Sequence, residues 1–423
     1  MKPSTIKFID KYAGISLCFL LTVVKAVSEI FKGKAMNYRP HRILLVKLIE
    51  QGATVLAIPS IKRAIEITGD ASRVYFCVFK ENRPVLDLLD LIPPQNIFEI
   101  RSTSILAFIV DVIKFIIFCR KNKIDGVVDM EFFSRASAIL CYLSGAKVRA
   151  GYHRFTSEYP YRGNLMTKKI QYNPYIHVSI AYYLLVESLI RDEETPMIKI
   201  PYSHLKFDLP QLTFTEKEKQ EVYEMLLKEN RRRILTRPFI ILNPNASDLI
   251  PLRKWPAHNF IALARRILDE FPQATIILTG APSEAKPVSK IAEEINHPNV
   301  ISMAGKTTLK QLLILYEICD LLVTNDSGPA HFSSLTGIKS IIMYGPETPL
   351  LFGPITDRAY VIWKKLACSP CVNVFNHRFS PCNDNKCMQA ITVEEVFGLI
   401  SGILNSQSVI CLLYTSPSPR DRQ

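Results

Sequence analysis

The sequence predicts an α/β protein with two Rossmann-like, doubly wound halves that face a central cleft. Short apolar segments alternate with helical ones up to residue 151, and the same alternation restarts at residue 239. The intervening residues 205–237 are polar and charged, which indicates a linker. Strands that alternate with helices imply parallel βαβ units, and such sheets bind ligands at the carboxyl ends of their strands.

In the first half, short apolar runs indicate buried strands and longer stretches indicate helices. The expected strands are residues 42–48, 72–79, 96–99, 126–130 and 147–151, and the expected helices are residues 55–67, 105–121 and 134–144. A Gln-Gly-Ala turn follows the first strand, at residues 51–53.

The second half repeats this alternation after an expected linker helix at residues 215–230. Its expected strands are residues 239–242, 275–279, 300–302, 321–324 and 339–344, and its expected helices are residues 258–271, 283–295, 309–319 and 330–336.

The composition favours anionic partners. Lys and Arg number 52 against 39 Asp and Glu, which gives a net charge of +13. This excess suits nucleotide-linked substrates or an anionic membrane face. Nucleic acid is not an expected partner, because the sequence has no arginine-rich run, zinc-finger spacing or RNA-binding aromatic motif.

Both ends of the chain are unusual. The apolar run AGISLCFLLTVV, residues 13–24, is shorter than the ~20 residues of a spanning helix. Lysines flank this run, which favours an amphipathic helix lying on a membrane. The alternatives are a helix packed on the protein's own surface, a secretory signal or a spanning helix. The end of the chain, YTSPSPRDRQ, has no periodicity and is expected to be a non-native or disordered tail.

A small-residue loop, NDSGPAH at residues 325–331, follows a buried strand and opens a short helix. Pro329 suits the first helical turn, where its missing N–H has no partner anyway. Such a turn presents backbone N–H groups and a positive dipole end, which is a place to hold phosphate.

This loop resembles the donor-binding signature of the ADP-heptose:lipopolysaccharide heptosyltransferases, glycosyltransferase family nine. The segments that are similar in the same order are LLVKLIEQGATVLAIPSIKR at 44–63, RKWP at 253–256, GAPSE at 280–284 and YGPETP at 344–349. The resemblance covers residues 42–400. It implies the GT-B fold, a nucleotide-sugar donor with an ADP-sugar favoured, a lipid-linked glycan acceptor such as lipopolysaccharide core, and no obligatory metal.

The expected activity is therefore transfer of a heptose or related sugar by a peripheral enzyme on the inner face of the cytoplasmic membrane. The alternatives are a catalytically impaired nucleotide-sugar-binding or scaffold protein, or another GT-B-type enzyme such as a nucleotide-sugar epimerase. The expected divisions are a membrane-associating helix at 1–40, an acceptor-side domain at 41–205, a linker at 206–237, a donor-binding domain at 238–409 and the tail at 410–423.

By this resemblance, the donor is held in the second half. The expected donor-binding residues are Asp326, Ser327, Gly328, Pro329, His331, Arg253, Lys254, Glu284 and Asn243. The turn amides and His331 are expected to contact the diphosphate, and one of Arg253 and Lys254 to neutralise it. Glu284 is expected to take ribose hydroxyls, or else to face the dipole of its helix.

The sequence departs from the family at the expected catalytic base. In the heptosyltransferases an aspartate directly follows the first glycine of the opening turn, whereas this chain has Ala53 there. Glu50, Asp129 and Glu131 are the replacement candidates, expected to point toward the same cleft. Each of them is alternatively an ordinary loop carboxylate.

Four cysteines, Cys368, Cys371, Cys382 and Cys387, have a spacing that suits a structural zinc ion. The same segment also resembles a cysteine-containing region of some family members that does not imply a metal. Free or paired structural cysteines are therefore the other interpretation.

Overall fold

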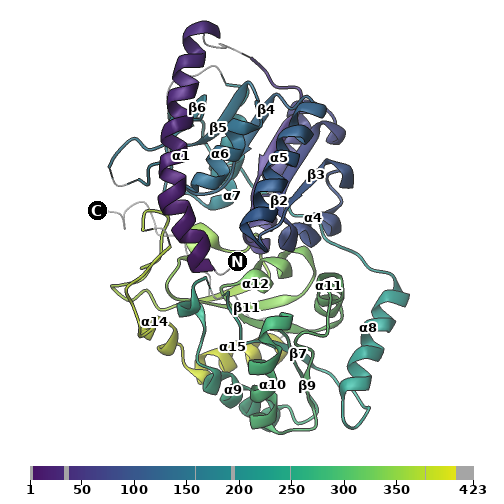
Figure 1. Ribbon diagram of the computed structural model, residues 1–423. Coiled ribbons are helices and arrows are strands. Elements are labelled where there is room, and N and C mark those ends of the chain that lie inside the picture. Colours follow the sequence, from purple (N-terminus) through teal and green to yellow (C-terminus); the bar gives the residue numbers. More distant parts are fainter. Residues whose placement is uncertain are drawn as a thin grey trace.

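The computed structural model describes residues 3–32, 38–157, 159–191, 196–247, 249–376 and 378–405. Two lobes lie one above the other in Figure 1, each built around a six-stranded sheet. The predicted α/β architecture with two doubly wound halves is confirmed. The tail expected at residues 410–423 lies outside the described residues.

The N-terminal lobe has the strand order β3-β2-β1-β4-β5-β6, with every neighbouring pair parallel. Its strands are β1 (Ile43–Val46), β2 (Val74–Phe79), β3 (Ile97–Ile100), β4 (Gly126–Asp129), β5 (Val148–Tyr152) and β6 (Lys168–Ile170). Its helices are α1 (Pro3–Lys32), α2 (Gln51–Leu56), α3 (Ile58–Thr68), α4 (Arg83–Leu89), α5 (Ile105–Lys121), α6 (Arg135–Leu143) and α7 (Val178–Glu187).

Both faces of this sheet are covered. Alternate residues of β1 point to opposite faces, so Ile43 and Leu45 join one apolar cluster while Leu44 and Val46 join another. Helices α3 and α7 cover the first face. Helices α5 and α6 cover the second, and α1 adds Cys18 to the same cluster.

The C-terminal lobe has the strand order β12-β11-β10-β7-β8-β9, again parallel throughout. Its strands are β7 (Phe239–Asn243), β8 (Thr275–Leu278), β9 (Val300–Ser302), β10 (Leu321–Asn325), β11 (Lys339–Tyr344) and β12 (Ala359–Trp363). Its helices are α8 (Glu216–Glu229), α9 (Ala257–Glu270), α10 (Ala285–Ile295), α11 (Leu309–Ile318), α12 (Gly328–Phe332), α13 (Pro349–Phe352), α14 (Lys386–Gln389) and α15 (Val393–Asn405). Helices α9, α10 and α15 cover one face, and α8 and α11 pack on the other.

The strand order fixes where a ligand is expected. In the first sheet β1 pairs with both β2 and β4, and in the second β7 pairs with both β8 and β10. The chain direction across each sheet therefore reverses beside β1 and beside β7. Doubly wound sheets bind ligands outside the carboxyl ends of the strands at such a reversal.

Several elements differ from those expected. The single helix predicted at 55–67 is divided into α2 and α3, because Pro59 begins a new helical turn near the start of α3. The helix predicted at 330–336 is the short α12 followed by a 3-10 turn at Ser333–Leu335. Helices α4 and α7, strands β6 and β12, and the C-terminal helices were not predicted.

The N-terminal helix is longer than its apolar run indicated. Helix α1 has 30 residues. Among the described residues, one helical segment, Tyr12–Ile30, is by length and composition apolar enough to cross a membrane, and only 17% of it is buried. A signal sequence near an N-terminus has the same length and apolar composition.

Candidate functional site

A cleft of about 1110 Å³ lies between the two lobes and is lined from both. The N-terminal lobe contributes the turn after β1 and residues near the start of α4. The C-terminal lobe contributes the loops that follow β7, β8 and β10. The cleft therefore lies at the reversal point of each sheet, as the topology requires.

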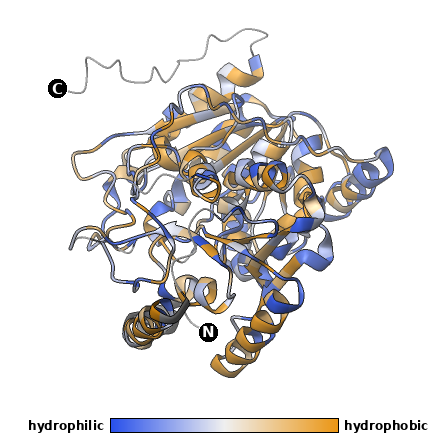
Figure 2. Cartoon of the chain, turned by 90° about the horizontal axis from the view of Figure 1, so that it is seen from above, coloured by the Kyte–Doolittle hydropathy of each residue, from blue (hydrophilic) through white to orange (hydrophobic). Residues whose placement is uncertain are grey.

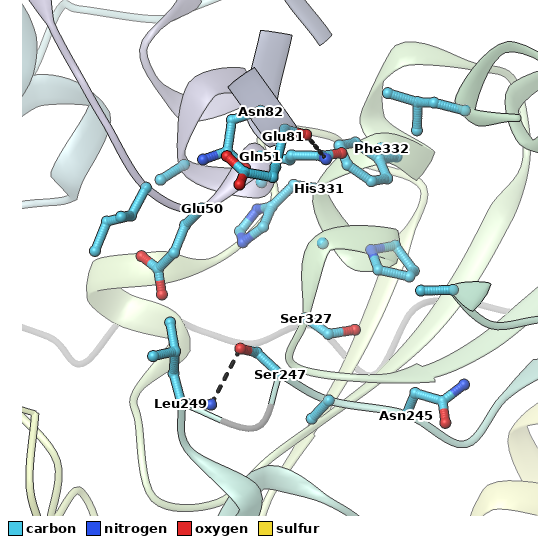
Figure 3. Close-up of a pocket in the computed structure, with 18 of the residues that line it drawn as sticks. Glu50, Gln51, Glu81, Asn82, Asn245, Ser247, Leu249, Ser327, His331 and Phe332 are labelled. Atoms are coloured by element: carbon cyan, nitrogen blue, oxygen red, sulfur yellow. Dashed lines mark hydrogen bonds between the residues drawn. The ribbon is translucent and has the colours of Figure 1, made fainter. Parts of the chain in front are cut away.

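The two lobes approach most closely where α2 meets α12. A Cβ atom on Gly52 would lie 2.5 Å from Cδ2 of His331 and 3.2 Å from Cα of Gly328. Any side chain larger than hydrogen at position 52 would force these helices apart. In Figure 3, His331 lies between the Glu50–Gln51 turn and the loop that carries Ser327.

The loop after β10 is fixed by its own hydrogen bonds. The backbone N–H of Asp326 donates to the Met343 carbonyl at 2.9 Å, and the Ser327 hydroxyl donates to the Asn325 carbonyl at 3.1 Å. The predicted loop residues that line the cleft are Asp326, Ser327, Gly328, Pro329 and His331.

Two side chains of this loop have unusual protonation. Burial raises the pKa of Asp326 to about 7, and the neighbouring Glu347 carboxylate adds to the shift. Burial lowers the pKa of His331 to about 3, so its imidazole is neutral at pH 7. Oδ2 of Asp326 and Nδ1 of His331 have no hydrogen-bond partner within the protein. Both are therefore buried polar atoms available to a ligand.

Two arginines converge on one buried carboxylate beside the loop. Nη1 of Arg253 lies 3.2 Å from Oε2 of Glu347 and 3.7 Å from Oδ2 of Asp326. Nη2 of Arg378 donates to the other Glu347 oxygen at 2.9 Å, and its Nη1 donates to Oε1 of Glu50 at 2.5 Å. Glu347 thus holds both guanidinium groups at the edge of the cleft.

Sequence analysis did not assign a role to Arg378 or Glu347. Arg378 lies within the cysteine segment, and that segment crosses to the N-terminal lobe, where Val374 joins the core and Phe375 packs on Tyr159 and Tyr172. The only sequence signal was the Glu347 position within the YGPETP motif.

The remaining predicted donor residues differ in their placement. Asn243 and Glu284 line the cleft, whereas Lys254 does not. The Asn243 amide donates to the Thr279 hydroxyl at 3.0 Å. A carboxylate oxygen of Glu284 accepts from the Ala281 backbone N–H at 2.7 Å.

The three candidates for the base occupy different environments. Glu50 lines the cleft, and Arg378 and Lys47 hold the pKa of its carboxyl down at about 2 against the opposing effect of burial. Asp129 is fully buried and paired with Arg162. Glu131 is buried and accepts from Lys47 at 3.0 Å and from the Leu48 backbone N–H at 2.7 Å.

The expectation that Asp129 and Glu131 point into the cleft is therefore wrong. Neither residue is among those that line it. The Glu131 carboxylate instead ties the segment after β4 to the end of β1, whereas the Asp129 carboxylate binds Ser137 of α6 and Arg162 inside the lobe.

The four cysteines do not form a metal site in the structure. Among the residues that the structure describes, no group of three or more His, Cys, Asp or Glu side chains is arranged to hold a metal ion. Cys368, Cys371, Cys382 and Cys387 are free thiols, of which Cys387 is buried and Cys368 and Cys382 are exposed. The zinc hypothesis has no support here.

Comparison with known proteins identifies the family. Residues 114–378 match glycosyltransferase family 9 (heptosyltransferase). Lipopolysaccharide heptosyltransferase 2 of Escherichia coli strain K12 is 30% identical over 156 residues, which are 36% of this chain and 42% of that protein. Lipooligosaccharide heptosyltransferase 2 of Campylobacter jejuni strain NCTC 11168 is 28% identical over 228 residues, 53% of this chain and 62% of that protein.

The solved structure of E. coli ADP-heptose lps heptosyltransferase II has a TM-score of 0.65 at 20% identity, covering 86% of this chain and 98% of that one. This likeness confirms the GT-B-type fold. The two curated relatives align over less than two thirds of their own length. The family match, by contrast, extends over more than half of this chain. The chain belongs to glycosyltransferase family 9, the heptosyltransferase family.

Proposed function

We propose that the protein is a glycosyltransferase that moves a heptose or related sugar from a nucleotide-sugar donor to a lipid-linked glycan such as lipopolysaccharide core. The observation that carries this proposal is the convergence of Arg253 and Arg378 beside the loop after β10, inside a cleft shared by both lobes. The E. coli relative is named for ADP-heptose, so an ADP-sugar is the favoured donor.

The donor diphosphate fits between the two guanidinium groups and the loop of Ser327, Gly328 and Pro329. Negative charge grows on the diphosphate as the sugar leaves, so fixed cations stabilise the transition state more than the ground state. His331 is neutral, so it donates a hydrogen bond to the diphosphate but contributes no positive charge. Protonated Asp326 donates to a donor oxygen, while Asn243 and Glu284 face the nucleoside.

Glu50 is the base that we propose, because it alone of the three candidates lines the cleft. Its pairing with Arg378 makes it a weak base as it stands. A bound diphosphate competes for Arg378, and loss of that cation raises the pKa of the Glu50 carboxyl toward its ordinary range. Donor binding thereby activates the base.

A lipid-linked acceptor places the enzyme at a membrane surface. We propose a peripheral position on the inner face of the cytoplasmic membrane, with α1 as an anchor. The exposure of α1 supports this placement, since little of its apolar segment is buried in the protein.

Donor binding is tested by thermal denaturation with ADP- and UDP-linked sugars. A ligand that binds only the native state raises Tm. ADP-heptose is expected to raise Tm, and Arg253→Gln is expected to weaken its binding at least about tenfold through loss of charge-assisted hydrogen bonds.

The matched control is Lys254→Gln, which removes the neighbouring cation that does not line the cleft. It is expected to leave donor affinity within about twofold of wild type, as for a cation outside the site. Equal losses in the two variants would contradict the assignment of Arg253 to the donor.

A further inference from the structure

Helix α1 has an inverted distribution of polar and apolar residues. Its contacts with the protein are mostly polar: Asp10 pairs with Arg135 at 3.0 Å, and the Thr22 hydroxyl accepts from the Asn164 backbone N–H at 2.8 Å. Lys25 is buried and donates to the Met166 carbonyl at 3.3 Å. Among the side chains of α1 that the structure describes, at residues 10 and 12–30, the exposed ones are instead mainly apolar: Tyr12, Ile15, Leu17, Phe19, Leu20, Val23, Val24, Val27 and Ile30.

These contacts hold α1 against the lobe from Asp10 to Lys25. A Cβ atom on Gly163, whose φ is +73°, would lie 2.7 Å from the Cys18 carbonyl oxygen. Asp10 also accepts from the backbone N–H groups of Arg135 and Ala136 at the start of α6. Helix α1 therefore lies on the lobe as a fixed element, with its apolar side turned outward.

Helix α5 exposes a second apolar stripe. Its buried side carries Asp111, Phe115 and Cys119, and Asp111 is paired with Arg101 at 2.7 Å. Its exposed side carries Ile105, Leu106, Ile109, Val110, Ile113 and Ile117. The four isoleucines among them recur every four residues, so they lie along one face of the helix.

The two helices lie on the same side of the molecule. Both contribute buried side chains to the apolar cluster on one face of the first sheet. In Figure 2 they are the two largely orange helices that project together from one side. Fifteen of the 24 exposed large apolar side chains in the described part of the chain belong to α1 and α5.

The charge on the α5 part of this surface is positive, whereas the exposed ionic side chain among the described side chains of α1 is Glu29. The ionic side chains that α5 leaves exposed are Lys114, Arg120 and Lys121, all cations, and exposed Lys123 lies two residues after the helix end. Exposed isoleucines, with Lys114 among them and further cations at the end of the helix, match the boundary between the acyl chains and anionic headgroups of a bilayer.

We infer that α1 and α5 together form one bilayer-binding face, which inserts both helices in the plane of an anionic phospholipid membrane. Helix α5 starts just after β3, at the carboxyl edge of the sheet. Helix α1 has its N-terminal part at the same edge, because its Asp10 binds the start of α6, which follows β4. That edge faces the cleft, so the bilayer adjoins the cleft mouth. The inference deepens the membrane placement in the proposed function and rests on it.

The test is co-sedimentation of the full chain with vesicles of phosphatidylethanolamine and phosphatidylglycerol, and with phosphatidylcholine vesicles. Ile117→Glu replaces a 61% exposed isoleucine of α5, and the control Ile234→Glu replaces a 63% exposed isoleucine before β7. Ile117→Glu is expected to weaken binding to the anionic vesicles about tenfold, as loss of buried apolar area with added negative charge requires. The control is expected to bind as wild type does, and phosphatidylcholine vesicles are expected to bind less than anionic ones.

Equal vesicle binding by the two variants would overturn the role of α5. A second outcome would also overturn the inference: the wild-type protein is a dimer, Ile117→Glu converts it to monomers, and neither form binds vesicles. That result would show that a second copy of the chain covers this face. Donor-induced Tm shifts are measured on the same proteins. Failure of the wild-type protein to bind anionic vesicles, with intact donor-induced Tm shifts, counts against this inference alone. Vesicle binding by the wild-type protein without donor-induced Tm shifts counts against the proposed activity alone.

Discussion

At the scale of residues, the site is a compact cluster of opposite charges within a cleft. Glu347 is buried and holds Arg253 and Arg378, while Arg378 also binds Glu50. Removing one partner of such a buried cluster typically costs about 3–5 kcal/mol, because the other charge is left unpaired. The side chains of this cluster therefore maintain the fold of the cleft edge and fix both guanidinium groups there.

Asp326 and His331 make opposite contributions to stability as pH changes. Native Asp326, with a pKa raised to about 7, keeps a proton that the unfolded chain releases near its ordinary value of 3.8. The free energy of unfolding therefore falls as pH rises between these values. Native His331, with a pKa lowered to about 3, stays unprotonated at pH values below 6.5, where the histidine of the unfolded chain binds a proton. Its contribution to the free energy of unfolding therefore increases as pH rises from about 3 to 6.5.

Single substitutions separate these two contributions. Relative to wild type, Asp326→Asn is expected to gain stability as pH rises from about 4 to about 7, and His331→Gln to gain stability as pH falls from about 6.5 to about 3. Urea unfolding across this pH series measures both differences. If plots of the free energy of unfolding against pH ran parallel to that of the wild-type protein for both variants, the assigned protonation states would be contradicted.

At the scale of elements, the contact between α2 and α12 sets the width of the cleft. Gly52→Ala places a methyl group against His331, and overpacking of this kind typically destabilises by about 1–3 kcal/mol. We expect reduced stability together with weaker donor binding, because the displaced helix carries the donor loop. Gly337→Ala is the matched control, because a Cβ there meets no atom within 4 Å.

The measurements are urea unfolding and donor titration of both variants. Gly337→Ala is expected to change the free energy of unfolding by no more than about 0.5 kcal/mol, as is usual for surface substitutions. A Gly52→Ala protein with wild-type stability and donor affinity would show that the close approach of the two helices is not required.

The sequence predicted elements best where they are long or apolar. The bounds predicted for α5, residues 105–121, are those observed. The face that it exposes was not predicted, because the helix is apolar nearly all round and its buried side depends on contacts with distant strands. Strand β6 was missed because it has three residues, two of them lysines.

The site was predicted only in part for a similar reason. The donor loop is local in sequence, so its motif was recognisable. Arg378 reaches Glu50 across 328 residues of sequence, and no local pattern records that contact. Asp129 and Glu131 were misplaced because a carboxylate at a strand end turns either into the cleft or back into the lobe, and buried Arg162 and Lys47 draw them inward.

At the scale of the whole molecule, the two lobes divide the proposed work. In the proposed reaction the C-terminal lobe would hold the donor, and the N-terminal lobe would supply Glu50, the cleft edge and the surface of α1 and α5. An acceptor carried by a bilayer then reaches the sugar from the side of the N-terminal lobe. Both substrates therefore have to occupy the cleft before any sugar leaves the donor.

Transfer of a sugar to a lipid-linked acceptor is measured as release of nucleoside diphosphate from an ADP-sugar, with and without a lipopolysaccharide-core glycolipid. Rapid release of the nucleoside diphosphate is expected only when the glycolipid is present. The sugar is then expected to be recovered on the glycolipid. Glu50→Gln is expected to lower the rate at least about 100-fold, the size of a general-base contribution. Release at the same rate without acceptor, or by Glu50→Gln at the wild-type rate, would contradict the account.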